Sequence, residues 1–207
     1  MEELLAFARR HDLWFVSDEV YDEVVFDDAF LSAGSLADPG DRLVSIYSFS
    51  KVYAMTGWRV GYLVAPPELA RILTGMQEPI ISCVNTPAQM AALAAVSGPQ
   101  EVVGEMSDSY RVRRDELLEA LERGGLPSSR PMGAFYVWTD VSEAGVTSME
   151  FARSLIEREH VAVAPGSAFG ELGEGYVRLS LASSREELLE GTSRLVRFVR
   201  LPGEARC

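Results

Sequence analysis

Residues 48–62, SFSKVYAMTGWRVGY, decide the fold of this chain. An apolar run at residues 43–47 directly precedes them and predicts a buried strand. Lys51 therefore lies just past a strand end, with Ser48 before it and Arg59 at the start of the next predicted strand. A lysine in such a place, taken alone, is far more often a surface residue than a reactive one, because lysine is almost never buried.

The neighbours of Lys51 change that interpretation. Ser48 and Arg59 offer a hydroxyl and a guanidinium, which together with backbone N–H groups are suitable donors for a phosphate. A lysine whose pKa is lowered by its surroundings can attack an aldehyde. The segment therefore combines a candidate nucleophile with a candidate phosphate site.

A second group of polar residues follows the strand predicted at residues 13–16. Asp18 could hold a proton on a ring nitrogen, and the Tyr21 phenol could reach a ring oxygen if the chain turns there. Each residue also has an ordinary alternative. Asp18 could cap a helix or turn, and Tyr21 could pack at the edge of the core.

Several segments carry a family resemblance. They are SDEVYDE at residues 17–23, the stretch at residues 48–62, PGSAFG at residues 165–170 and GEGYVRLSLA at residues 173–182. In this order they resemble the motifs of pyridoxal phosphate (PLP)-dependent aminotransferases of class I/II, which have fold type I. The resemblance runs from about residue 13 to about residue 200, nearly the whole chain.

The resemblance implies a role for each motif residue. Lys51 would carry PLP as a Schiff base and later move a proton between substrate and cofactor. Asp18 would pair with the pyridinium nitrogen, and Tyr21 would hydrogen-bond the phenolic oxygen of the ring. Ser48 and Arg59 would bind the phosphate.

Arg178, in the last motif, would bind the substrate α-carboxylate. A planar guanidinium matches a carboxylate with two parallel hydrogen bonds, which suits that role. The alternative is an arginine on an alternating strand that faces solvent or a surface carboxylate. The resemblance further implies an amino acid and a 2-oxo acid as substrates, and a homodimer.

The predicted fold is α/β, similar to fold type I PLP transferases. We expect a partial mixed sheet of the large PLP-binding domain at residues 1–98, an interdomain helix at residues 99–124 and a small α+β C-terminal domain at residues 125–207. Similar family members carry a substantial segment before the residue that matches Asp18. We therefore expect this chain to be the C-terminal portion of an aminotransferase.

Local patterns give two more detailed expectations for the C-terminal part. Residues 148–159 predict a helix with Ser148 as its N-cap. Residues 161–164 alternate valine and alanine, which predicts a strand.

Composition excludes several classes of function. The formal net charge of −12 argues against a general nucleic-acid-binding protein, which needs a basic face. No apolar run is long enough for a membrane span. Cys83 and Cys207 form no disulfide framework, which favours a reducing cytoplasm. His11 and His160 are isolated, so we expect no metal site.

Other functions remain open at this point. They are another fold type I PLP enzyme, such as a carbon–sulfur lyase or a synthase, a fragment of an aminotransferase-like regulator that senses PLP, and an inactive remnant. The stretch MTGWRVGY at residues 55–62 favours the aminotransferases.

Overall fold

The structure is a computed structural model that describes residues 1–38 and 40–200. Cys207, for which no disulfide framework is expected, lies outside the described residues. Two compact units divide the chain, Met1–Ser107 and Asp108–Cys207, and each is described here by itself. The domain limits predicted above stay predictions.

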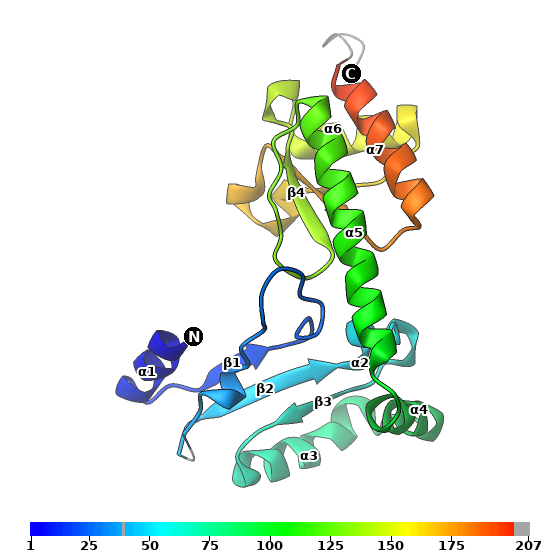
Figure 1. The fold of residues 1–207 in the computed structure, drawn as a ribbon. Helices are drawn as coiled ribbons and strands as arrows, with labels where there is room; N and C mark the ends of the chain where they lie inside the picture. Colours follow the sequence, from blue (N-terminus) through cyan, green and yellow to red (C-terminus); the bar gives the residue numbers. More distant parts are fainter. Residues whose placement is uncertain (39, 201–207) are drawn as a thin grey trace. The chain divides into compact units, whose positions relative to one another are not determined.

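The first unit is built around a three-stranded mixed sheet (Figure 1). Strand β1 (Phe15–Asp18) pairs in parallel with β2 (Leu43–Ser48), and β2 pairs antiparallel with β3 (Gly61–Val64). The remaining elements of this unit are α1 (Glu2–Arg10), η1 (Ala33–Ser35), α2 (Phe49–Val52), η2 (Thr56–Trp58), α3 (Pro67–Ile81) and α4 (Thr86–Ser97). The order β1-β2-β3 makes β1 and β3 the two edges of the described sheet.

The register of this sheet brings the functional motifs to neighbouring strands. Asp18 at the end of β1 lies opposite Ile46 of β2, and Ser48 at the end of β2 lies opposite Gly61 of β3. A Cβ on Gly61 would lie 2.6 Å from the Tyr47 carbonyl oxygen, closer than any side chain tolerates. Glycine at this position therefore permits the close pairing of β2 and β3.

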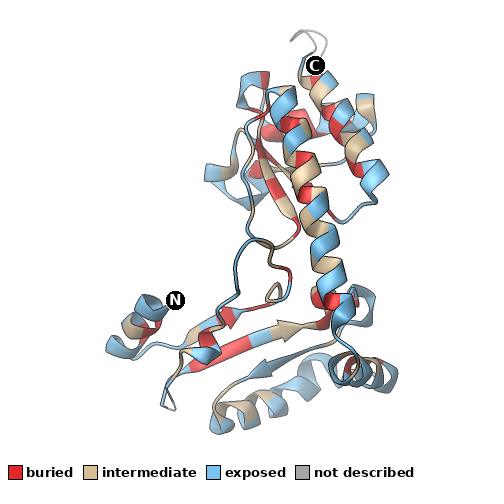
Figure 2. Cartoon of the chain, viewed as in Figure 1, coloured by how far each residue is buried: buried red, intermediate tan, exposed pale blue. Residues whose placement is uncertain are grey.

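Apolar side chains of the first unit remain exposed on β3 and α3. All four residues of β3 are exposed, and none of the described residues of α3 is buried (Figure 2). Ile80 is 70% exposed. The small core nearest the Lys51 motif is formed instead by Phe49, Met55 and Ala92.

The second unit contains a three-stranded antiparallel sheet in the order β4-β6-β5. Its strands are β4 (Tyr136–Asp140), β5 (Ala164–Pro165) and β6 (Tyr176–Ser180). The other elements are η3 (Ser142–Ala144), α6 (Ser148–Glu159), η4 (Gly166–Phe169), η5 (Glu171–Gly173) and α7 (Arg185–Val199). Helix α5 (Glu101–Gly124) begins in the first unit and ends in the second.

The core of the second unit follows from the alternation along its strands. Val137 and Val177 point to the same face of the sheet and are fully buried. On the helices, the rings of Phe151 and Phe198 meet edge to face with centroids 5.3 Å apart. Burial of a large apolar side chain contributes about 1.5–3 kcal/mol, so these contacts give this unit a substantial core.

Two local predictions for the second unit were wrong. The N-cap of α6 is Thr147, which forms a capping box with Glu150, while Ser148 is the first helical residue. The strand predicted at residues 161–164 is only the pair Ala164–Pro165. Val161 lies instead beside Gly191 of α7, so its apolar side chain packs against a helix rather than extending the sheet.

Candidate active site

Helix α2 presents Lys51. The Ser48 Oγ accepts a hydrogen bond from the Ser50 N–H at 3.1 Å and so caps the helix. Phe49 and Val52 are buried and anchor the helix on the core. Lys51, between them, is half-buried.

Lys51 and Tyr21 come from distant positions and meet in the structure. The Lys51 Nζ lies over the Tyr21 ring, 6.0 Å from its centroid. Two consecutive turns after β1 bring Tyr21 to this place, with Asp22 N–H donating to the Glu19 carbonyl and Val24 N–H to the Tyr21 carbonyl. The predicted role of Tyr21 requires the chain to turn in this segment, and the structure contains that turn.

Arg59 is held next to the start of α2. Its backbone is left-handed, with φ of 51°, and its Nη1 donates to the Thr56 carbonyl oxygen at 2.9 Å. The next residue, Val60, accepts the Phe49 N–H at 3.3 Å. Arg59 therefore directly precedes the residue whose carbonyl binds the start of the helix that Ser48 caps.

Asp18 ends β1 with an exposed side chain. Among the described residues its carboxylate has no hydrogen-bond or ion-pair partner, so it caps no helix or turn there. In the register it stands beside Ile46, two residues before Ser48. An unpartnered carboxylate at this edge remains available to a ligand.

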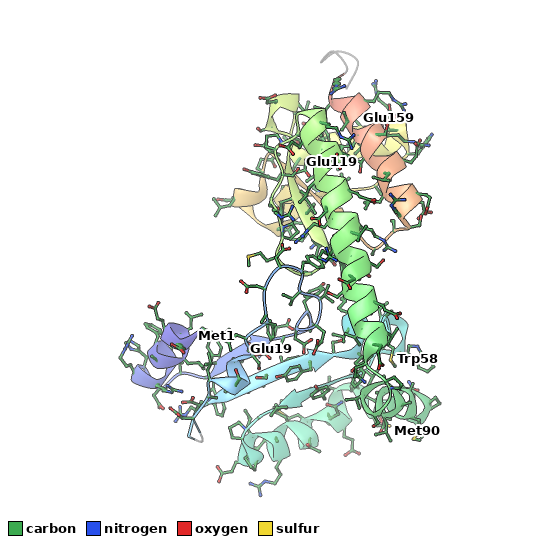
Figure 3. All side chains as sticks on the ribbon, in the orientation of Figure 1. Met1, Glu19, Trp58, Met90, Glu119 and Glu159 are labelled. Atoms are coloured by element: carbon green, nitrogen blue, oxygen red, sulfur yellow. The ribbon has the colours of Figure 1, made fainter. Side chains whose placement is uncertain are left out.

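Glu19, labelled in Figure 3, was not singled out from the sequence. Its carboxylate is buried, and the residue is only 2% exposed. Ser32 Oγ donates to Oε2 at 2.7 Å and the Ala33 N–H donates to Oε1 at 2.9 Å. Burial opposes ionisation, but the hydrogen bonds from Ser32, Ala33, Tyr47 and Ser17 outweigh it and lower the pKa of Glu19. Glu19 thus fixes the η1 loop to the sheet beside Asp18.

Arg178 belongs to the second unit, on β6, opposite Trp138 of β4. Its guanidinium carbon lies over two aromatic rings, 4.0 Å from the Tyr136 centroid and 4.3 Å from the Phe169 centroid. No carboxylate of the described residues forms an ion pair with it. The surface ion pair considered as an alternative is therefore not present in the described part of the chain.

The PGSAFG motif forms η4, which presents Phe169. Gly166 and Gly173 cross so closely that a Cβ on Gly166 would lie 1.8 Å from the Gly173 carbonyl oxygen. Ser148 ties this crossing to α6, because its Oγ donates to a Glu174 carboxylate oxygen at 3.1 Å and accepts the Ser167 N–H at 3.2 Å. Steric fit and hydrogen bonds together fix the turn.

The structure thus groups the predicted residues Lys51, Tyr21, Ser48 and Arg59 around α2, and places Asp18 on the neighbouring strand. Arg178 lies in the other unit. One sequence signal was overlooked. Lys51 is the only lysine in the chain, whose other 18 basic side chains are all arginines.

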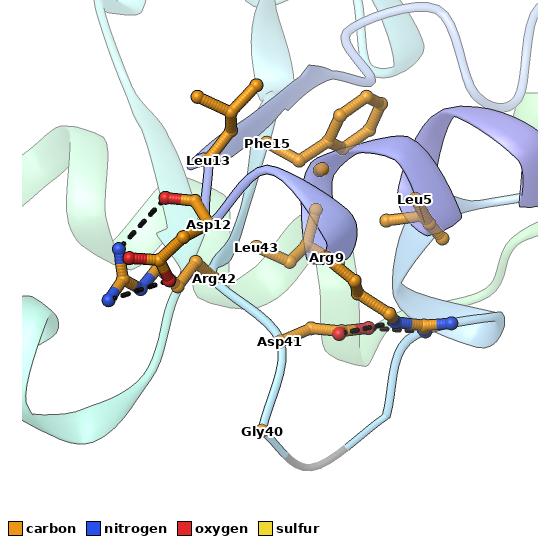
Figure 4. A pocket seen from close by; sticks show the side chains of 10 residues that line it. Leu5, Arg9, Asp12, Leu13, Phe15, Gly40, Asp41, Arg42 and Leu43 are labelled. Atoms are coloured by element: carbon orange, nitrogen blue, oxygen red, sulfur yellow. Dashed lines mark hydrogen bonds and ion pairs between the residues drawn. The ribbon is translucent and has the colours of Figure 1, made fainter.

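A separate cavity of about 200 Å³ lies between α1 and the segment that leads into β2 (Figure 4). Arg9 reaches Asp41 there with two hydrogen bonds of 2.6 Å, and Arg42 pairs with Asp12 at 3.0 Å. None of the predicted site residues lines it. Across the described residues, no group of three or more His, Cys, Asp and Glu is placed to hold a metal ion.

Comparison with known proteins decides the family. The family model described as "Aminotransferase class I and II" matches residues 1–195. The chain belongs to the class I and II aminotransferases. It is 39% identical to an aspartate aminotransferase of Pyrococcus abyssi and 38% identical to aromatic-amino-acid aminotransferase 2 of Thermococcus litoralis, in each case over 97% of this chain and 52% of the relative.

Solved structures of aminotransferases have the same fold. The aspartate aminotransferase of Thermotoga maritima superimposes with a TM-score of 0.88 at 38% identity, over 97% of this chain and 51% of that one. An aromatic aminotransferase of Pyrococcus horikoshii gives the same TM-score, over 95% and 53%. The predicted α/β, fold type I architecture is confirmed, and the chain spans about half the length of the relatives it matches.

No helix in the described parts of this aminotransferase chain is both long and apolar enough to cross a membrane.

Proposed function

We propose that this chain provides the PLP-binding lysine of an aminotransferase that moves an amino group between an amino acid and a 2-oxo acid. One observation carries the proposal: the only lysine of the chain lies over the Tyr21 ring at the end of a capped helix. Arginine cannot replace lysine here, because a guanidinium keeps its proton and does not add to an aldehyde.

The donor set around α2 fits PLP. This cofactor carries an aldehyde, a phenolic oxygen, a ring nitrogen and a phosphate. The first unit offers the Lys51 amine, the Tyr21 phenol, the Asp18 carboxylate, and the Ser48 hydroxyl with the Arg59 guanidinium. The Ser48 oxygen already accepts the Ser50 N–H, so its own proton remains able to donate to a phosphate oxygen.

When bound, PLP supplies an electron-poor ring that accepts the electron pair released as a bond at the substrate α-carbon breaks. Lys51 would attach the cofactor through Nζ and, once released, carry the proton away from the α-carbon. Asp18 would hold a proton at the ring nitrogen. Tyr21 would donate its O–H to the ring oxygen, and Arg178 would bind the α-carboxylate.

The substrate class follows from the same set of residues. Arg178 would bind the carboxylate that every amino acid and 2-oxo acid shares, so it does not choose between side chains. The relatives named above act on aspartate or aromatic amino acids by their names, which supports amino acid donors for this chain. We further propose that the active protein is a homodimer and that it works in the cytoplasm.

The test is reductive trapping. The chain is incubated with PLP, reduced with borohydride and digested, and the modified peptides are mapped by mass spectrometry. We expect the adduct on Lys51 and its loss in Lys51→Arg, which keeps the positive charge but not the amine. The amino terminus is the internal control, because it is the other primary amine. An adduct on Lys51 no more abundant than that on the amino terminus would overturn the proposal.

A turnover assay then tests the reaction class. With an amino acid and a 2-oxo acid supplied together, a new 2-oxo acid should form in the wild type and not in Lys51→Arg. Release of ammonia without the acceptor would indicate a lyase instead.

A further inference from the structure

The face of the second sheet opposite the core carries an arginine among aromatic rings. Along β4 and β6 the buried residues Val137 and Val177 alternate with Tyr136, Trp138 and Arg178, which point to the other face. The cation therefore occupies a regular position on a strand, and the packing of the core behind it fixes its backbone.

Both rings next to Arg178 are themselves supported. The Phe169 ring meets Trp138 edge to face at 5.3 Å, and the Tyr136 ring is tilted against Phe135 at 4.7 Å. Phe135 is buried. Phe169 is 48% exposed and so depends on its contact with Trp138 for its position, whereas the Tyr136 ring rests on a buried ring; the contacts of 4.0 and 4.3 Å to the guanidinium depend on this support.

Aromatic contacts hold a guanidinium without neutralising it. A ring attracts the cation through its negative face, whereas the N–H donors lie in the guanidinium plane and remain available. Arg178 has no carboxylate partner among the described residues, so those donors are not consumed by an ion pair. A planar carboxylate is the ligand that such a free edge binds best.

We propose that Tyr136 and Phe169 are positioning residues that hold the Arg178 guanidinium in place for the substrate carboxylate. This inference rests on the proposed function, in which Arg178 binds that carboxylate. Phe169 owes its position to the crossing of Gly166 and Gly173, so the PGSAFG motif acts on Arg178 through the Phe169 ring.

The test reads the Arg178 side chain directly. The Nε–Hε resonance of Arg178 is assigned by its loss in Arg178→Gln and is followed by NMR while acetate replaces chloride at constant ionic strength. We expect a saturable shift in the wild type. In Phe169→Leu and in Tyr136→Leu the dissociation constant for acetate should rise about threefold to tenfold, as the loss of one cation–π contact predicts. Phe169→Tyr and Tyr136→Phe keep the ring and should restore the wild-type value.

Leu172→Ala is the matched control, because Leu172 is 99% exposed on η5 and is not one of the two residues whose rings the guanidinium lies over. If both leucine variants bind acetate as the wild type does, the inference is overturned. If one leucine variant no longer gives the NMR spectrum of a folded protein, the acetate titration of the other leucine variant decides the test. If the ring-retaining variants also lose affinity, a ring contact is not the cause and the inference is overturned as well.

The titration needs neither PLP nor turnover, so it separates the two proposals. Absence of an adduct on Lys51 would refute the proposed function and leave the acetate result intact. In active protein the same leucine variants should raise KM for the amino acid severalfold with little change in kcat, because binding and not chemistry is affected.

Discussion

Replacing Glu19 by alanine removes the carboxylate that joins β1 to the η1 loop. The Ala33 N–H that donates to it is buried, and Ala33 is 0% exposed, so this donor loses its acceptor inside the protein. Ser32 Oγ loses its acceptor at the same time. At about 1.5–3 kcal/mol for each hydrogen bond to a charged group, we expect Glu19→Ala to lower the free energy of unfolding by about 3–6 kcal/mol.

The assay is urea unfolding followed by hydrogen exchange and mass spectrometry, because the two units need not unfold together. Peptides that contain residues 15–36 report on the affected region. Glu23→Ala is the control, since Glu23 is exposed and its side chain accepts no hydrogen bond in the described structure, and its effect should stay within about 0.5 kcal/mol. Equal midpoints for the two variants would refute the assignment of Glu19 as the anchor of the loop.

The same residue predicts a pH dependence. The pKa of Glu19 in the folded chain is lowered from its ordinary value of 4.5, so the folded state prefers the ionised form. Its contribution to stability is therefore complete above pH 4.5 and is lost as the pH falls through the folded value. The gap in stability between the wild type and Glu19→Gln should narrow on acidification.

Two further predictions concern the first unit. Gly61→Ala should cost about 1–3 kcal/mol of stability in urea unfolding, because its Cβ would clash with the Tyr47 carbonyl, whereas Gly57→Ala has open space and serves as the control; similar losses for both would contradict the argument. Arg9 lowers the pKa of Asp41 to about 2 through its hydrogen bonds, so that stabilisation is full above the ordinary value of 3.8 and disappears as the pH falls to about 2. An NMR titration should find the Asp41 pKa back near its ordinary value in Arg9→Leu, and a pKa that stays near 2 would show that Arg9 is not the cause.

Elements with a long or regular pattern were predictable from the sequence, and short ones were not. The apolar run at residues 43–47 lies in β2, and the helix expected at residues 99–124 corresponds to α5. Helix α2 has four residues, too few to show a helical period, and it depends on the Ser48 cap and on burial of Phe49. Those are tertiary conditions that no local pattern reveals.

The candidate site divides in the same way. Lys51, Tyr21 and Arg178 were predicted as site residues through motifs, and the structure supplies their contacts. Glu19 and Phe169 stand inside those same motifs but were missed, because their importance comes from partners far along the chain. Glu19 depends on the η1 loop, and Phe169 depends on a guanidinium on β6.

The crossing of Gly166 and Gly173 has a consequence for how such chains diverge. Any β-carbon at either position would force the two turns apart, whatever reaction the protein performs. Selection for folding alone therefore preserves these glycines, while Lys51 is preserved only by selection for an amine. Descendants that lose catalysis should keep both glycines and accept substitutions at Lys51. Which of these positions changes therefore distinguishes a lineage that is still catalytic from one that keeps only the fold.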